Sequence, residues 1–101
     1  MAYEIRWSNE ARADIRAVPV FRRGPIFAAI EQLQAQAEFQ TRNRKPLVEP
    51  LEILPDATWE VRVGEHRVFY RIDLGQTVDI LRVILKGGTT TAEAIGRGRK
   101  P

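Results

Sequence analysis

Alternation of apolar and polar residues predicts strands at the start of the chain and over most of its second half. The segment YEIRW, residues 3–7, places apolar side chains at every second position. The segment WEVRVGEHRVFYRID, residues 59–73, alternates in two runs around Gly64 and Glu65, which predicts a hairpin. The run TVDILRVIL, residues 77–85, is apolar at nearly every position, which is typical of a central strand.

Helical spacing replaces this alternation between residues 8 and 37. Ser8 offers a side-chain oxygen as the N-cap of a short helix that stops before Pro19. Pro25 suits the first position of a second helix. The apolar stripe of that helix consists of Ile26, Phe27, Ile30, Leu33 and Ala37. We therefore expect an α+β fold in which two N-terminal helices pack on an antiparallel sheet of about four strands.

Length and composition are those of one small domain. The 101 residues, 44% of them hydrophobic, predict a single domain over residues 1–101, with residues 87–101 as a flexible tail. The chain has no cysteine, which excludes disulfides and thiolate chemistry. We find no membrane-spanning apolar run, and the polar N-terminus is unlike a signal peptide, so we expect a cytoplasmic protein without a membrane partner. The motifs of phosphate loops and metal sites are absent, so the sequence predicts no metal and no other cofactor.

Basic residues are concentrated in the second half of the chain. The formal net charge is +3, and residues 42–101 hold eleven basic and eight acidic side chains. This surplus is compatible with a polyanionic partner such as nucleic acid. The connector from residue 40 to about 57 has no regular periodicity and begins with the basic motif TRNRKP. Connectors of this length are often functional, although a solvated basic loop is the alternative interpretation.

Side-chain parity divides the predicted sheet into an apolar face and a cationic face. Nine residues are expected beneath the helices: Trp59, Val61, Val63, Val68, Tyr70, Ile72, Leu81, Val83 and Leu85. The opposite face collects five cations and one acid, together with Phe69: Glu60, Arg62, Arg67, Phe69, Arg71, Arg82 and Lys86. Like charges on adjacent strands repel, so this face suits phosphate groups. The alternative is a solvated face whose arginines pair with Glu60 and Asp73. By parity His66 belongs to the core side.

The order and spacing of these elements resemble the RelE/ParE superfamily of toxins from bacterial toxin–antitoxin systems. The resemblance runs from about Tyr3 to Lys86 and includes the motifs WEVRV and HRVFYRID. The pieces RKP…EPL and EHRVFY are similar to the YoeB-like branch of ribosome-dependent messenger RNA nucleases. The resemblance implies a cognate antitoxin, the ribosome and messenger RNA in the ribosomal A site as partners.

Family chemistry implies a role for each of several residues. In these nucleases a ribose 2′-hydroxyl attacks the adjacent phosphate, which requires a base, cations for the developing charge and an acid for the leaving oxygen. By resemblance the catalytic residues are Glu49 as base, Arg67 and Arg62 as phosphate-stabilising cations, and Lys86 at the C-terminal end of the site. The expected RNA-binding residues are Arg44, Lys45, Phe69, Arg71 and Arg82, of which Phe69 would stack on a base.

Two other functions remain open in the same family. YoeB-like toxins carry a His-Tyr pair, and RelE-like toxins an Arg and a Tyr, where this chain has Lys86 followed by Gly87 and Gly88. A lysine with an ordinary pKa near 10.4 is a poorer proton donor at neutral pH than an imidazolium. The chain could therefore be a ParE-like inhibitor of DNA gyrase, or a toxin-derived protein that binds without catalysis. One fold hosts all three functions, so the fold does not distinguish them.

Overall fold

Two helices follow the first strand and four further strands complete the domain. The computed structural model describes residues 2–86, so the tail expected at residues 87–101 lies outside the described part. The elements are, in order, β1 Glu4–Trp7, α1 Asn9–Ala17, α2 Val20–Gln36, β2 Arg44–Pro46, β3 Trp59–Val63, β4 His66–Asp73 and β5 Thr77–Leu85. Within residues 2–86 no helix is long and apolar enough to cross a membrane. The predicted α+β class, with both helices N-terminal, is confirmed.

The starts of the two helices follow different rules. Ser8 caps α1 as predicted, because its side-chain oxygen accepts a hydrogen bond from the Ala11 N–H at 3.0 Å. The second helix begins at Val20, directly after Pro19, so the predicted start at Pro25 is wrong. Pro25 instead lies inside α2, where it cannot donate a hydrogen bond to the Phe21 carbonyl.

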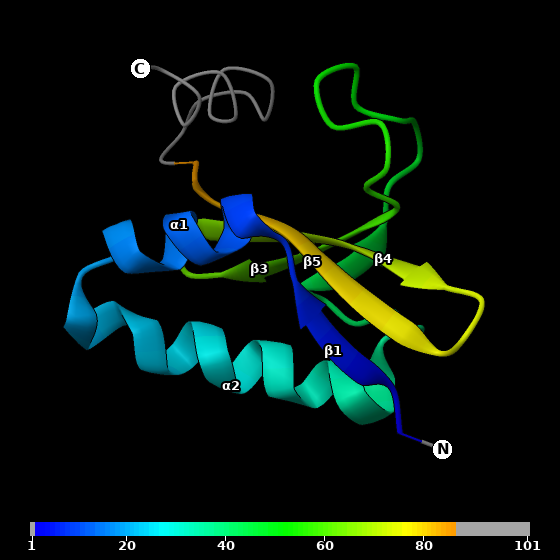
Figure 1. Ribbon diagram of the computed structural model, residues 1–101, viewed down its shortest axis with the longest axis horizontal. Coiled ribbons are helices and arrows are strands. Elements are labelled where there is room, and N and C mark those ends of the chain that lie inside the picture. Colours follow the sequence, from blue (N-terminus) through cyan, green and yellow to red (C-terminus); the bar gives the residue numbers. More distant parts are fainter. Residues whose placement is uncertain (1, 87–101) are drawn as a thin grey trace.

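The sheet is mixed and has five strands in the order β1-β5-β4-β3-β2. The expectation of about four antiparallel strands needs two changes. The connector contributes a short edge strand, β2, which pairs antiparallel with β3. The first strand pairs with β5 in parallel. The helices α1 and α2 carry the chain from β1 at one edge of the sheet to β2 at the other edge, and β5 then returns beside β1 (Figure 1).

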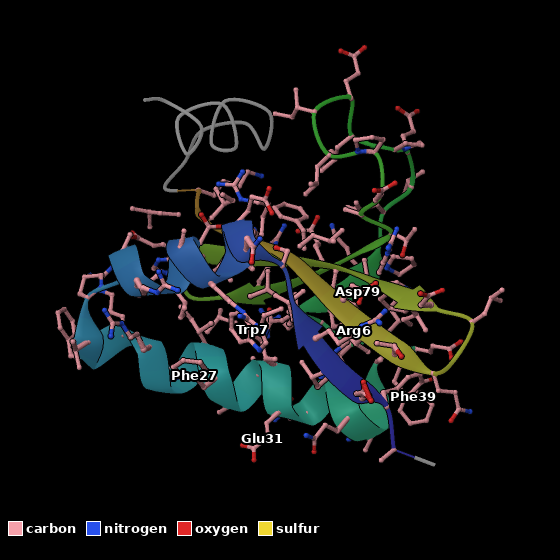
Figure 2. The ribbon with its side chains drawn as sticks, in the orientation of Figure 1. Arg6, Trp7, Phe27, Glu31, Phe39 and Asp79 are labelled. Atoms are coloured by element: carbon pink, nitrogen blue, oxygen red, sulfur yellow. The ribbon has the colours of Figure 1, made fainter. Side chains whose placement is uncertain are left out.

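The main core lies between α2 and one face of the sheet. Residues of α2 at helical spacing are buried against the apolar residues of β3 and β4; they are Ile26, Ile30 and Leu33. Trp59 stacks on Tyr70 with ring centroids 6.0 Å apart, and the Tyr70 hydroxyl donates a 2.8 Å hydrogen bond to the Ala37 carbonyl. Figure 2 shows Trp7 of β1 next to Phe27 of α2, with ring centroids 5.9 Å apart. The sequence-based assignment of Val61, Val68 and Tyr70 to the helix-covered face is confirmed.

A β-bulge reverses the expected parity of the first part of β5. Phe69 pairs with Arg82, but the next residue, Tyr70, pairs with Ile80, so Leu81 is the extra residue. As a result Val78 and Ile80 join the main core with Val83, whereas Leu81 packs in a second cluster. Leu85 is 53% exposed. The predicted position of Leu81 beneath the helices is therefore wrong, whereas Val83 is in the core as predicted and Leu85 lies opposite His66 but is not covered.

The second cluster lies on the face that was expected to be an open cationic surface. Its buried members are Ala57, Phe69 and Ile84. Aliphatic residues of the connector, and Leu81, pack against them: Leu47, Leu51, Ile53, Leu54 and Leu81. The connector thus covers part of the sheet face opposite α2, and its length is explained by this packing.

Candidate functional site

The β3–β4 hairpin brings two predicted phosphate-binding residues directly opposite each other. Arg62 of β3 and Arg67 of β4 are cross-strand partners. The strands are joined at Gly64, whose φ of +60° lies in the left-handed region that glycine adopts without strain. Like charges that face each other across a strand pair destabilise a sheet. The folded hairpin therefore holds a pair of cations that an anion would stabilise.

Arg67 is held in place but is poorly neutralised. Its side chain is 14% exposed, and its Nη1 donates to the carbonyls of His66 at 3.2 Å and Gly64 at 3.4 Å. Its Nε is buried without a hydrogen bond, and the Glu60 carboxylate lies 3.7 Å from it. Burial and the nearby Arg62 charge lower the pKa of Arg67, and Glu60 opposes this effect. The guanidinium stays charged at neutral pH, because arginine titrates far above it.

Two more charged residues, Lys45 and Glu60, lie next to the Arg62–Arg67 pair on the sheet. Lys45 of β2 pairs with Glu60 of β3, which in turn pairs with Phe69. Lys45 is exposed, whereas Glu60 is buried. Arg62, which is exposed, and Arg67 therefore share one sheet face with Lys45, since side chains two residues apart on a strand point the same way. This group of three cations around Glu60 is the candidate site, and we call it the hairpin site.

Arg82 does not reach the solvent. Its side chain is 4% exposed and forms a two-point ion pair with Asp14 of α1, with Nε–Oδ2 and Nη2–Oδ1 distances of 2.7 and 3.0 Å. Asp14 also accepts a hydrogen bond from the Val83 N–H at 2.8 Å. The expected contact between Arg82 and RNA is therefore wrong, because α1 packs beside β5 and neutralises the guanidinium.

Arg44 is also buried and is held by hydrogen bonds within the protein. It is 3% exposed, and its Nη1 donates to the carbonyls of Gln36 and Phe39 at 3.2 Å each. Its Nη2 donates to the side chain of Gln32 at 3.1 Å. Arg44 thus donates to carbonyl groups at the end of α2 and directly after it. It is not accessible to RNA, and neither is Phe69, which is 1% exposed in the second cluster.

Arg71 is accessible but is balanced by carboxylates. Its Nε lies 3.0 Å from Asp79 and its Nη1 lies 3.7 Å from Asp56. Asp79 also pairs with Arg6 of β1 at 3.0 Å, and both residues are labelled in Figure 2. Burial opposes the ionisation of Asp79, but the hydrogen bonds from Arg71 and Arg6 outweigh it and lower the pKa of that carboxyl. This network ties β1, β4 and β5 together.

The remaining predicted residues lie on the connector and next to the turn between β3 and β4. Glu49 is exposed on the connector. Lys86 is partly exposed directly after β5, and its N–H donates to the Glu65 carbonyl at 2.9 Å. His66 is buried, at 6% exposed, on the side that parity assigned to it. Among residues 2–86 no group of three or more His, Asp and Glu side chains is arranged to hold a metal ion.

Sequence reasoning missed the residues that remove cations from the surface. Asp14 and Arg82 are 68 positions apart, and no local pattern signals their pairing. The burial of Phe69 depends on the bulge and on the fold of the connector, neither of which has a signature in the alternation of β5. A cavity beside α1, lined in part by Arg22 and His66, was also not anticipated.

A sequence model of the family described as the ParE toxin of type II toxin–antitoxin systems matches residues 5–86. The chain belongs to the RelE/ParE family of toxins. No curated protein matches the toxin. The matched range begins one residue into β1 and ends directly after β5, so apart from Glu4 it includes every strand and both helices of the described part.

Solved structures of the family share the fold of this toxin. The toxin–antitoxin complex RelBE2 from Mycobacterium tuberculosis contains a chain that is 32% identical, with 82% of this toxin and 96% of that chain covered and a TM-score of 0.58. The archaeal RelE–RelB complex from Pyrococcus horikoshii is 16% identical, with coverage of 88% and 100% and a TM-score of 0.69. The isolated Escherichia coli RelE toxin is 17% identical, with coverage of 95% and 98% and a TM-score of 0.61. The latter two similarities concern the fold alone.

Proposed function

We propose that this toxin is a ribosome-dependent endoribonuclease that cleaves messenger RNA in the cytoplasm and is held inactive by a cognate antitoxin. The observation that carries the proposal is the opposed pair Arg62 and Arg67, in which Arg67 has a buried Nε without a hydrogen bond. A phosphate group bound beside the two guanidiniums would relieve the repulsion between them. Two of the similar structures are complexes of RelE-type toxins with antitoxins, which supports the antitoxin partner.

The side chains assigned by the family resemblance account for the steps of this reaction. Glu49 removes the proton of a ribose 2′-hydroxyl, and the 2′-oxygen forms a bond to the adjacent phosphorus. The bond from phosphorus to the 5′-oxygen breaks, which leaves a 2′,3′-cyclic phosphate and a 5′-hydroxyl. Arg67 and Arg62 stabilise the additional negative charge of the phosphorane. Lys86 offers a cation on the side of the leaving oxygen, whose proton comes from Lys86 or from water.

RNA contacts outside the reacting phosphate are fewer than the sequence suggested. Of the five residues expected to bind RNA, Lys45 is exposed and unhindered at the hairpin site, and Arg71 is partly exposed but paired. We therefore assign RNA binding to Lys45, with a weaker contribution from Arg71. Messenger RNA in a ribosome is already positioned, so a small contact area on the toxin is compatible with the proposal.

The test is cleavage by purified toxin on ribosomes that carry a defined message, with RNA ends mapped by primer extension. Replacing Arg67 by Ala should lower the cleavage rate about 100-fold or more, because a preorganised transition-state donor is lost. Arg67→Lys keeps a charge but loses the planar fork, so it should recover part of the rate. Glu49→Gln should also slow cleavage.

Arg42→Ala, which removes an exposed arginine with no assigned role, is the matched control and should cleave at the parent rate. Parent-rate cleavage by a folded Arg67→Ala would refute the assigned site.

A second candidate function is inhibition of DNA gyrase. Two observations favour it: the matching family model is that of ParE toxins, and three residues expected to bind RNA are buried. Inhibition of gyrase supercoiling by the purified toxin, without cuts in ribosome-bound message, would support this function instead. Absence of both activities would support a toxin-derived binding protein.

A further inference from the structure

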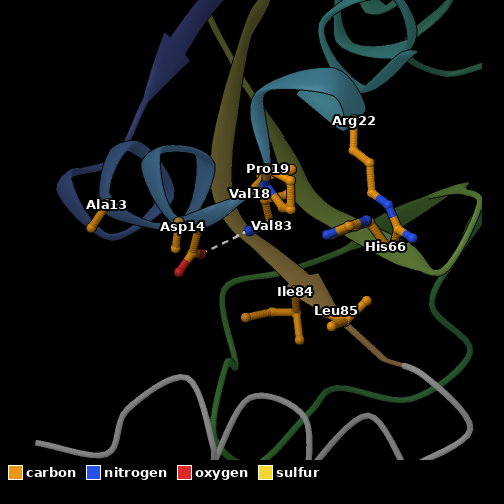
Figure 3. Close-up of a pocket in the computed structure, with 10 residues that line it drawn as sticks. Ala13, Asp14, Val18, Pro19, Arg22, His66, Val83, Ile84 and Leu85 are labelled. Carbon is orange, nitrogen blue, oxygen red and sulfur yellow. Dashed lines mark hydrogen bonds between the residues drawn. The ribbon is translucent and has the colours of Figure 1, made fainter. Parts of the chain in front are cut away.

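A cavity of about 520 Å³ lies at the elbow where α1 turns into α2 (Figure 3). Its walls come from α1, the turn at Pro19 and the end of β5, and they are largely aliphatic: Ala13, Ala17, Val18, Val83, Ile84 and Leu85. Two polar side chains, Arg22 and His66, lie close together on one side of it (Figure 3). The cavity is distinct from the hairpin site, because none of the residues of the hairpin site lines it.

Exposed apolar residues continue this cavity across the surface. Val20 and Phe21, at the start of α2, are 74% and 79% exposed, and Leu85 at the cavity wall is 53% exposed. A second cavity of about 310 Å³ adjoins the same Arg22 and His66 from the other side, and Phe21 lines it. We call Val20, Phe21, Arg22, His66 and Leu85, with the two cavities, the elbow surface. Contiguous exposed apolar surface of this kind marks sites of interaction.

The border of the elbow surface is basic. Arg12, Arg16 and Arg22 are exposed on α1 and α2. The single acid between residues 12 and 23 is Asp14, which is already neutralised by Arg82. The ion pair of Arg22 with Glu65 spans 3.7 Å, and the two side chains are 48% and 66% exposed. An exposed pair of this kind contributes little free energy, so Arg22 is available to another carboxylate.

His66 adds to the cavity an imidazole ring that is available for hydrogen bonding. No side chain among residues 2–86 forms a hydrogen bond with its ring. Burial and the Arg22 charge lower the pKa of His66, with Glu65 opposing, so the ring is neutral at pH 7. A neutral imidazole presents one donor and one acceptor to a bound segment.

We propose that the elbow surface is the docking site of an acidic, amphipathic segment of the antitoxin. Apolar side chains of that segment would enter the larger cavity, and a carboxylate would bind Arg22. The inference rests on the antitoxin partner of the proposed function. The toxin's own residues 87–101 fit less well, because they carry Arg97, Arg99 and Lys100 and a single large aliphatic residue, Ile95. Their charge has the same sign as that of the basic border.

The test is the affinity of toxin variants for the antitoxin encoded beside the toxin gene, measured by calorimetry. Phe21→Ala and Arg22→Glu should each raise Kd about tenfold or more, as expected for an aromatic and an arginine at the centre of an interface. Leu74→Ala and Arg42→Glu are the matched controls, since they remove an exposed apolar side chain and reverse an exposed charge elsewhere. Both controls should bind within about twofold of the parent, as surface changes outside an interface do. Parent-like affinity of Phe21→Ala and Arg22→Glu would overturn the proposal.

Two further measurements separate this inference from the proposed function. In the complex, hydrogen exchange should slow at residues 20–24 and 64–66, and protection confined to other segments would overturn the docking site. The free variants Phe21→Ala and Arg22→Glu should cleave ribosome-bound message as the parent does, because neither residue belongs to the hairpin site. If the parent toxin cleaves no RNA, and Phe21→Ala and Arg22→Glu still weaken its binding to the antitoxin, the endoribonuclease proposal fails and the docking site stands.

Discussion

Replacement of Asp14 by Ala should destabilise the toxin more than any change at an exposed ion pair. Asp14 accepts two hydrogen bonds from Arg82 and one from the Val83 N–H, at distances of 2.7 to 3.0 Å. The two side chains are 13% and 4% exposed. The substitution leaves a buried guanidinium without a counterion and a strand-edge N–H without an acceptor, since β1 ends before β5 does.

The expected loss is a large fraction of the total stability. Breaking a buried pair by removing one partner costs about 3–5 kcal/mol. A domain of this size has a free energy of unfolding of about 5–15 kcal/mol. At about 4–8 °C per kcal/mol, a loss of about 3 kcal/mol lowers Tm by at least about 12 °C. The double variant Asp14→Leu with Arg82→Met should recover much of this loss, because it removes both charges and retains side-chain volume.

The measurement is urea unfolding followed by circular dichroism, with a matched carboxylate as control. Asp56→Ala removes a carboxylate that is 70% exposed and lies 3.7 Å from Arg71, so it should cost under about 1 kcal/mol. A cost for Asp14→Ala as small as that of Asp56→Ala would refute the burial argument. It would also return Arg82 to the set of residues that can bind RNA.

Two further predictions test the other corrections to the sequence-based picture. Phe69→Ala should cost about 3–5 kcal/mol in urea unfolding, because the ring is 1% exposed in the second cluster; a cost under about 0.5 kcal/mol would mean that Phe69 is a surface residue. The lowered pKa of His66 means that the folded state binds fewer protons than the unfolded state near and below pH 6.5, so stability should fall as the pH drops from about 7 to 5. His66→Asn should weaken this dependence, and an unchanged slope would contradict it.

The hairpin and the helix-covered face could be predicted because local patterns determine them. Alternation around Gly64 fixes the pairing of Arg62 with Arg67, and the stripe of α2 fixes the face that it covers. The opposite face could not be predicted in the same way. One extra residue, Leu81, offsets the side-chain alternation before it from the alternation after it, so Val78 and Ile80 lie on the same face as Val83, and nothing in an almost uniformly apolar strand indicates where the bulge occurs. The connector was expected to be functional because it is long, but its aliphatic residues cover Phe69.

The candidate site and the elbow surface meet at two consecutive residues of β4. His66 lines the elbow cavity, and Arg67 lies on the opposite face of the strand, beside Arg62. Neighbouring side chains on a strand point to opposite faces, so a segment docked on the elbow surface approaches Arg67 without covering it. Antitoxin bound there would leave the guanidiniums accessible to a small anion while its bulk excludes a partner as large as a ribosome. An antitoxin that instead covered Arg62 and Arg67 is therefore distinguishable from one docked at the elbow surface. Inorganic phosphate should bind at Arg67 equally well in the free toxin and in the complex if docking occurs at the elbow.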